Sequence, residues 1–170
     1  MKTLNLKSVF APIAFYTKRL AAFMSNLDDN LMIKTVKVTI GGVGVSGCNY
    51  NFATAANYTE QIIDFGHVLP AMCKIIDVTS LTDTAFTACT TLVAEVGISS
   101  SGNECVASAT IKAQGAITTL AHAGALNNAP VNAAGHIFVS ATPDSGTTWA
   151  AITAGKVSYY ITYLDLAGQD

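Results

Sequence analysis

Apolar and polar residues alternate along most of the chain after residue 33. The clearest example is Lys34–Ile40, where Val36, Val38 and Ile40 would share one face. Successive side chains of a β-strand point to opposite faces of its sheet, so a period of two predicts a half-buried strand. The same alternation, bounded by turn residues, predicts further strands within Gln61–Phe65, Cys73–Leu81, Thr91–Ile98, Glu104–Lys112, Ile117–Leu120, His136–Thr142 and Gly155–Leu166.

The run Cys73–Leu81 is the least regular of these strands, because two isoleucines stand side by side near its start. A strand that is buried on both faces, for example beneath a neighbouring subunit, would explain such a pair. With strict alternation, one face holds Ile76 and Val78, and the other holds Ile75, Asp77, Thr79 and Leu81.

The turn-like sequence Ser99–Asn103 predicts a β-hairpin, since serine, glycine and asparagine favour turns. Glu104–Lys112 should therefore pair with Thr91–Ile98. The apolar face of that earlier strand would hold Leu92, Ala94, Val96 and Ile98.

The predicted strands follow one another at intervals of about ten residues, and no internal repeat is visible. This spacing is typical of sandwiches and jelly rolls. The last strand, Gly155–Leu166, is apolar on both faces and is expected at the centre of a sheet. We therefore predict an all-β domain over residues 34–170, built as a two-sheet antiparallel β-sandwich that is jelly-roll-like.

Residues 1–33 form an N-terminal arm with a different pattern. After Pro12, apolar residues recur every three or four positions, which predicts a short amphipathic helix within Ile13–Leu27. Three roles are open for it: packing on its own domain, docking on a neighbouring subunit or capsid surface, and binding at a membrane surface. The residues expected to bind a partner are Ile13, Tyr16, Lys18, Arg19, Leu20 and Phe23.

Charge is scarce in this chain and unevenly distributed. Charged residues make up 12% of its 170 residues, against ~25% in ordinary soluble domains, whereas apolar residues make up 51%. Two solutions are open, separately or together: much of the surface is buried between subunits, or it consists of Thr, Ser, Ala and Gly. The first 27 residues carry four basic side chains and no acidic one, and the rest carry five basic and eleven acidic ones. A segment of charge +4 thus precedes one of charge −6, and the two are expected to meet different partners.

The bulk numbers also argue against two classes of partner. The net charge of −2 gives no sign of nucleic-acid binding. No apolar run approaches the ~20 residues that span a membrane. We expect neither nucleic acid nor a membrane among the partners.

The four cysteines do not have the spacing of a metal site. Cys48, Cys73, Cys89 and Cys105 form no CxxC pair, which structural zinc sites usually contain. Two disulfides are arithmetically possible. We favour four buried or half-buried thiols, as in a protein made in a reducing cytosol.

No sequence pattern typical of catalysis is present either. His67 is expected in a turn and His136 on the polar face of a strand, and neither belongs to an HxH or GxSxG motif. The glycine-rich stretch Gly41–Cys48 lacks the lysine of a phosphate-binding loop and predicts a turn or bulged strand. We therefore expect no enzyme, no metal and no cofactor.

Spaced aromatic residues are the remaining candidates for ligand binding, because aromatic rings stack on sugars and bases. No basic residue interleaves with them in Asn49–Glu60, so a core or interface role is the more ordinary interpretation. The candidates are Tyr50, Phe52, Tyr58 and Trp149.

Three segments, PAMCKIIDV, TLVAEVGISSSG and AGKVSYYITYLDL, resemble small structural proteins of tailed bacteriophages. The resemblance covers about Gly66–Leu166, and Ala113–Pro130 has no counterpart in it. It implies a β-sandwich in a virion, often as a homotrimer, serving as a capsid decoration protein, a head fibre base or a tail component. It implies no catalytic residues.

Two functions remain open. The leading interpretation is a structural virion protein, made in the host cytoplasm, that decorates or cements a capsid and is anchored through residues 1–33. Its partners would be further copies of itself and the major capsid protein or other virion subunits. The alternative is a receptor- or carbohydrate-binding module of a phage tail, a fibre or a cell surface, using the four candidate aromatic residues.

Overall fold

The computed structural model describes residues 33–70, 73–100, 102–115, 117–118 and 136–165. The chain divides into two units, Met1–Met32 and Ile33–Asp170, and every described residue belongs to the second. The helix predicted within Ile13–Leu27, and the six arm residues expected to bind a partner, therefore lie outside the described residues. Ile33, which we expected to end the arm, is the first residue of a strand.

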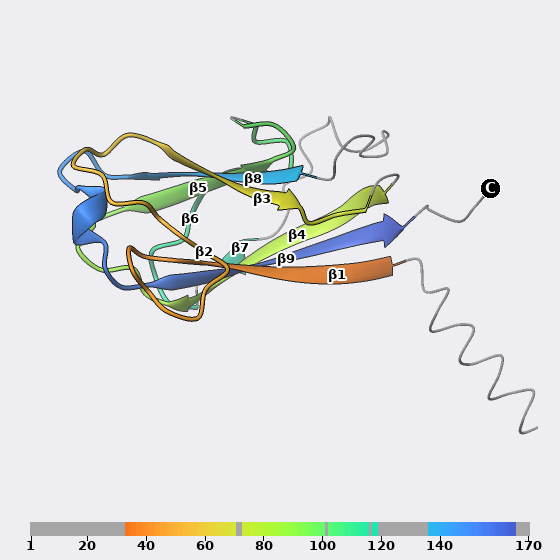
Figure 1. Cartoon of the computed structure of the whole chain (residues 1–170), viewed down its shortest axis with the longest axis horizontal. Coiled ribbons are helices and arrows are strands. Elements are labelled where there is room, and N and C mark those ends of the chain that lie inside the picture. The colour runs from red at the N-terminus through yellow and green to blue at the C-terminus, as the bar shows by residue number, and fades with distance from the viewer. Residues whose placement is uncertain (1–32, 71–72, 101, 116, 119–135, 166–170) are drawn as a thin grey trace, which may run out of the picture. The chain divides into compact units, whose positions relative to one another are not determined.

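Two sheets packed face to face make up the described part of the chain (Figure 1). Every strand pairing is antiparallel except that between β1 and β2. This confirms the predicted two-sheet β-sandwich. One sheet has the order β2-β1-β9-β4-β7, with β2 Tyr50–Asn51, β1 Ile33–Gly41, β9 Lys156–Asp165, β4 Cys73–Thr84 and β7 Ile117–Thr118. The other has the order β3-β8-β5-β6, with β3 Gln61–His67, β8 His136–Pro143, β5 Leu92–Gly97 and β6 Val106–Thr110.

Strand β9 lies at the centre of the five-stranded sheet, as its apolar character predicted. It pairs with β1 on one side and with β4 on the other. Val157, Tyr159 and Ile161 face the core between the sheets. On the opposite face Ser158 is also buried, and its hydroxyl is hydrogen-bonded to the Asp83 carboxylate. Burial on both faces thus arises within a single chain.

The structure corrects the predicted faces of Cys73–Leu81. A β-bulge interrupts the pairing of β4 with β9 between Ile75 and Asp77, and the strand continues to Thr84. The extra residue resets the alternation, so Ile75 and Val78 both face the core, whereas Ile76 is 38% exposed. The prediction that Ile76 and Val78 share a face was wrong.

The predicted hairpin between Thr91–Ile98 and Glu104–Lys112 is confirmed as the antiparallel pair β5–β6. Its turn is held by the Glu104 carboxylate, which accepts hydrogen bonds from the Ile98 N–H and the Ser99 hydroxyl, both at 3.1 Å. Leu92, Ala94 and Val96 face the core as expected. Ile98 does not: it follows the end of β5 and is 36% exposed, because the chain has already entered the turn.

Among the described residues, two buried side-chain hydroxyls have no hydrogen-bond partner, those of Ser140 and Tyr159. Tyr159 is buried between the sheets, and its hydroxyl makes no hydrogen bond. Burial raises the pKa of this phenol, which therefore stays neutral. Among the described residues no helix is long and apolar enough to cross a membrane.

Candidate functional site: an open sheet edge and its pocket

Strand β1 is an edge strand over most of its length. Its neighbour β2 is only two residues long and pairs with Ile40 and Gly41. Asn49 extends this pairing by one residue: its side-chain oxygen accepts the Thr39 N–H at 2.9 Å, and its N–H donates to the Thr39 carbonyl at 3.1 Å. The backbone of Thr39 is thus satisfied on the side away from β9.

The rest of this edge is open among the described residues. The backbone groups of a paired strand point alternately to its two sides. Because those of Thr39 point away from β9, those of Thr35 and Lys37 point the same way. No described residue exchanges a backbone hydrogen bond with Thr35 or Lys37 on that side. With respect to the part of the chain that the structure describes, the edge therefore presents a short row of unpaired donors and acceptors.

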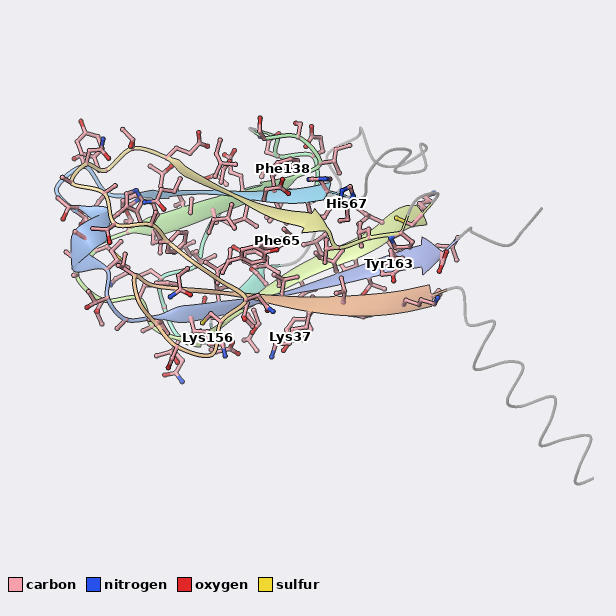
Figure 2. All side chains as sticks on the ribbon, viewed as in Figure 1. Lys37, Phe65, His67, Phe138, Lys156 and Tyr163 are labelled. Carbon is pink, nitrogen blue, oxygen red and sulfur yellow. The ribbon has the colours of Figure 1, made fainter. Side chains whose placement is uncertain are left out.

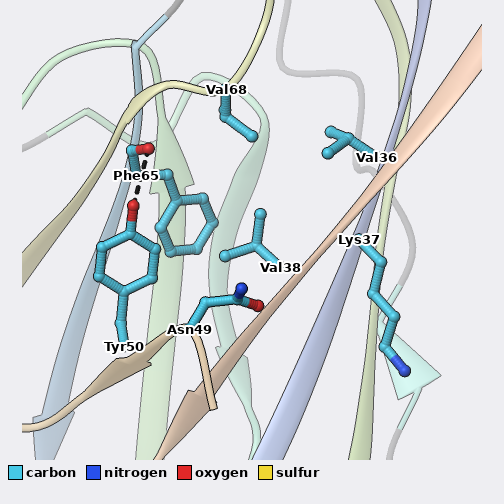
Figure 3. Close-up of a pocket in the computed structure, with 7 residues that line it drawn as sticks. All are labelled: Val36, Lys37, Val38, Asn49, Tyr50, Phe65 and Val68. Atoms are coloured by element: carbon cyan, nitrogen blue, oxygen red, sulfur yellow. Dashed lines mark hydrogen bonds between the residues drawn. The ribbon is translucent and has the colours of Figure 1, made fainter.

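A pocket of about 340 Å³ lies beside this edge (Figure 3). Its apolar walls come from both sheets, because β1 contributes to one side and the end of β3 to the other. The Tyr50 hydroxyl donates to the Phe65 carbonyl at 2.9 Å, and the two rings stack with centroids 5.3 Å apart. This contact joins the two sheets beside the open edge of β1. The lining residues are Val36, Lys37, Val38, Asn49, Tyr50, Phe65 and Val68.

Lys37 reaches away from the pocket. Its side chain points away from the other lining residues in Figure 3, and it projects from the five-stranded sheet on the side away from the second sheet in Figure 2. Its ammonium lies 5.3 Å from the centre of the Tyr160 ring. Such a cation–π contact is worth ~0.5–1 kcal/mol at an exposed site. Next to it, the hydroxyls of Thr35 and Thr162 are 2.9 Å apart. The outer face beside the edge is thus polar, and Lys37 contributes a cation to it.

Two histidines lie in contact where β3 ends and β8 begins. His67 is the last residue of β3, not part of a turn as we expected, and it pairs with His136 with ring centroids 4.4 Å apart. His136 begins β8 on its polar face, as predicted. Its Nδ1 lies 2.8 Å from the Asp64 carboxylate. Partial burial opposes ionisation there, but hydrogen bonds from the Gly66 N–H and His136, with the electrostatic influence of both imidazoles, hold the pKa of Asp64 below its ordinary value.

This cluster joins two strand ends. Within the described ranges, no group of three or more His, Cys, Asp or Glu side chains has the geometry to hold a metal ion.

The predicted ligand-binding aromatic residues fall into two groups. Phe52 and Trp149 belong to the core: their rings are 4.5 Å apart, and the Trp149 N–H donates to the Thr59 carbonyl at 2.7 Å. A buried ring cannot stack on a ligand, so these two serve packing. Tyr58 is 52% exposed, and Tyr50 is half-buried at the pocket. The structure does not bring the four together on one surface.

All four cysteines are free thiols in the structure. Cys73 and Cys105 are buried, and Cys48 and Cys89 are half-buried. Burial raises the pKa of the Cys105 thiol to about 12, and it also raises those of Cys73 and Cys89. A thiol is reactive as its thiolate, so burial lowers the reactivity of these three.

No protein family model and no curated protein sequence matches the chain. Among solved structures, a chain of the cyanophage Pam1 capsid asymmetric unit has a TM-score of 0.53 at 15% identity, over 78% of this chain and 84% of that one. A chain of the capsid of Ralstonia phage GP4 has a TM-score of 0.48 at 16% identity, over the same shares. The first of these likenesses is one of fold: the β-sandwich described here has a counterpart in the Pam1 capsid asymmetric unit.

Proposed function

We propose that this chain is a structural virion protein of a tailed bacteriophage and, more specifically, a capsid decoration or cement protein anchored through residues 1–33. The observation that carries the proposal is the fold likeness to a chain of a cyanophage capsid asymmetric unit, which extends over 78% of this chain. The three segments that resemble phage structural proteins support it independently. The expected home of the protein is therefore the virion, after synthesis in the host cytoplasm.

The surface chemistry of the sandwich fits an assembled protein. With 12% charged residues, the chain has few ions to desolvate when one subunit covers another. The outer face of the five-stranded sheet carries hydroxyls that are already hydrogen-bonded, such as those of Thr35 and Thr79. Covering these two hydroxyls would leave neither of them unpaired. We propose a homo-oligomer, a trimer in the form that the resemblance implies, in contact with the major capsid protein or other virion subunits.

The arm is the proposed anchor, because it combines apolar and basic residues. Burying a large side chain such as Leu20 or Phe23 contributes ~1.5–3 kcal/mol at full burial, before ordering costs. Exposed ion pairs of Lys18 or Arg19 would add only ~0–1 kcal/mol each. Apolar burial should therefore dominate attachment, and charge should adjust it.

Co-sedimentation with empty capsids tests the proposal. We expect the full chain to bind saturably, and a chain without residues 1–27 to remain folded by circular dichroism but to lose attachment. Leu20→Asp should weaken binding more than Lys18→Ala, and added salt should weaken it only modestly. Failure of the full chain to bind capsids would contradict the proposal. Full binding by the truncated chain would move the contact to the sandwich.

A receptor- or carbohydrate-binding role is the second candidate. One observation favours it: Tyr58 is 52% exposed beside Asn57 and Thr59, whose side chains are hydrogen-bonded to each other at 2.8 Å. An exposed ring flanked by amide and hydroxyl groups is suited to a sugar. Binding of the isolated protein on a glycan array, lost in Tyr58→Ala, would support this role over capsid decoration.

A further inference from the structure

The open edge of β1 has a chemistry that an extended polypeptide matches. Its unpaired groups are the N–H and C=O of Thr35 and Lys37, which point away from β9 and have no backbone partner among the described residues. An exposed strand edge is a template for a further strand, whose own donors and acceptors recur at the same spacing. A helix has already used its backbone groups internally and cannot pair with such a row.

We propose that an extended segment of another virion subunit adds to the five-stranded sheet along Ile33–Val38 of β1. The inference rests on the proposed virion function and specifies how the β-sandwich itself contacts its partner. Main-chain hydrogen bonds would supply the pairing, and side-chain pockets would select the sequence.

The pocket beside the edge places one requirement on the sequence of the partner segment, an apolar side chain. Val36, Val38 and Phe65 contribute to its walls, and its volume is about 340 Å³. An apolar cavity of about 150 Å³ already holds a benzene molecule, so this pocket has room for an aromatic or large aliphatic side chain. An added strand beside β1 directs alternate side chains toward it. The partner segment should therefore carry a bulky apolar residue at that position.

Lys37 gives the partner a second requirement. It has no carboxylate partner among the described residues, whereas the other lysine of β1, Lys34, is paired with Asp165 at 2.8 Å. β1 itself contains no acidic residue. A carboxylate opposite Lys37 on the incoming strand would complement this charge.

The same lysine argues against a second copy of β1 as the occupant. An antiparallel pair of two β1 strands would bring the lysines of both copies to one short edge, and like charges that face each other across strands are destabilising. Lysine on an edge strand is also a known means of preventing self-pairing. The edge is therefore suited to a different, acidic strand.

Two pairs of matched variants of the full chain test this inference on empty capsids. Thr35→Pro removes an outward N–H and obstructs the edge, whereas Thr35→Ala keeps that N–H and removes the methyl group and the hydroxyl that contacts Thr162. Lys37→Glu reverses the charge at the edge. Lys156→Glu makes the same change on the same face of the sheet at β9, and so serves as its control.

We expect Thr35→Pro and Lys37→Glu to weaken capsid binding about tenfold or more, and their controls to change it less than about twofold. Hydrogen exchange should show the amides of Thr35 and Lys37 unprotected in the free protein and protected on the capsid.

Three results would overturn the inference. The first is protection of both amides in the free protein, which would mean that another segment of this chain already covers the edge. The second is capsid binding that Thr35→Pro leaves unchanged, which leaves the proposed function intact. The third is a Thr35→Pro variant whose oligomeric mass falls while its capsid binding is unchanged. That result would assign the edge to a second copy of this chain. If the full chain does not bind capsids at all, the proposed function fails first.

Discussion

Replacing Gly155 with alanine is expected to lower the free energy of unfolding by about 3–5 kcal/mol, because two costs coincide there. The backbone has φ of 109°, a region that side chains with a Cβ rarely adopt. An added Cβ would also lie 2.6 Å from the Cα of Phe86, whose ring is buried against the same site. Urea denaturation followed by circular dichroism measures the loss.

Two glycines separate these costs. Gly44 has φ of 75° but no atom near an added Cβ, so Gly44→Ala should show the backbone cost alone, ~1–2 kcal/mol. At Gly42 an added Cβ would lie 2.6 Å from the Ile152 carbonyl oxygen, at a φ outside the left-handed region, so Gly42→Ala should show the steric cost alone. If Gly155→Ala lowered the free energy of unfolding no more than Gly44→Ala does, this would contradict the close packing of Phe86 against Gly155, just before β9.

Trp149→Ala is expected to cost about 3–5 kcal/mol of unfolding free energy, as for other buried aromatic residues. The side chain is fully buried, and it packs on Phe52 with ring centroids 4.5 Å apart. Its indole N–H also donates a hydrogen bond to the Thr59 carbonyl at 2.7 Å. Urea denaturation again gives the loss.

Trp149→Phe is the matched variant, since it retains a ring and removes the hydrogen bond. Its cost should be clearly smaller than that of the alanine variant. Equal stability of wild type and Trp149→Ala would instead indicate an accessible ring, free to serve as a ligand platform.

The strands could be predicted because their signal is local. A strand with one face in the core shows its period of two in its own sequence, as Lys34–Ile40 does. The central position of β9 was also predicted, because apolar side chains such as Val157 and Tyr160 occupy both of its faces. Neither inference depends on which strands are neighbours in a sheet.

The features that were missed depend on pairing between distant residues. The bulge at Ile76 can be recognised only from the pairing of β4 with β9. Strict alternation therefore placed Val78 on the same face as Ile76, whereas in the structure Val78 faces the core. Trp149 was a candidate ligand-binding residue, but the chain returns it to a core that also contains Phe52 and Phe86.

The open edge was missed for the same reason. Whether a strand is an edge depends on how much of it its neighbour covers, and β2 covers only Ile40 and Gly41. The sequence Gly41–Cys48 predicted a turn but not the parallel return that follows it. Lys37 in an apolar strand was the one available signal, because lysine often marks strand edges.

The composition of purified particles tests the central claim most directly. Virions of the phage that carries this sequence would be purified by density gradient, and peptides of this chain would be quantified by mass spectrometry against those of the major capsid protein. A structural virion protein should be present at a fixed ratio that persists through repeated purification. A chain that is abundant in the producing cells but absent from the purified particles would contradict the account.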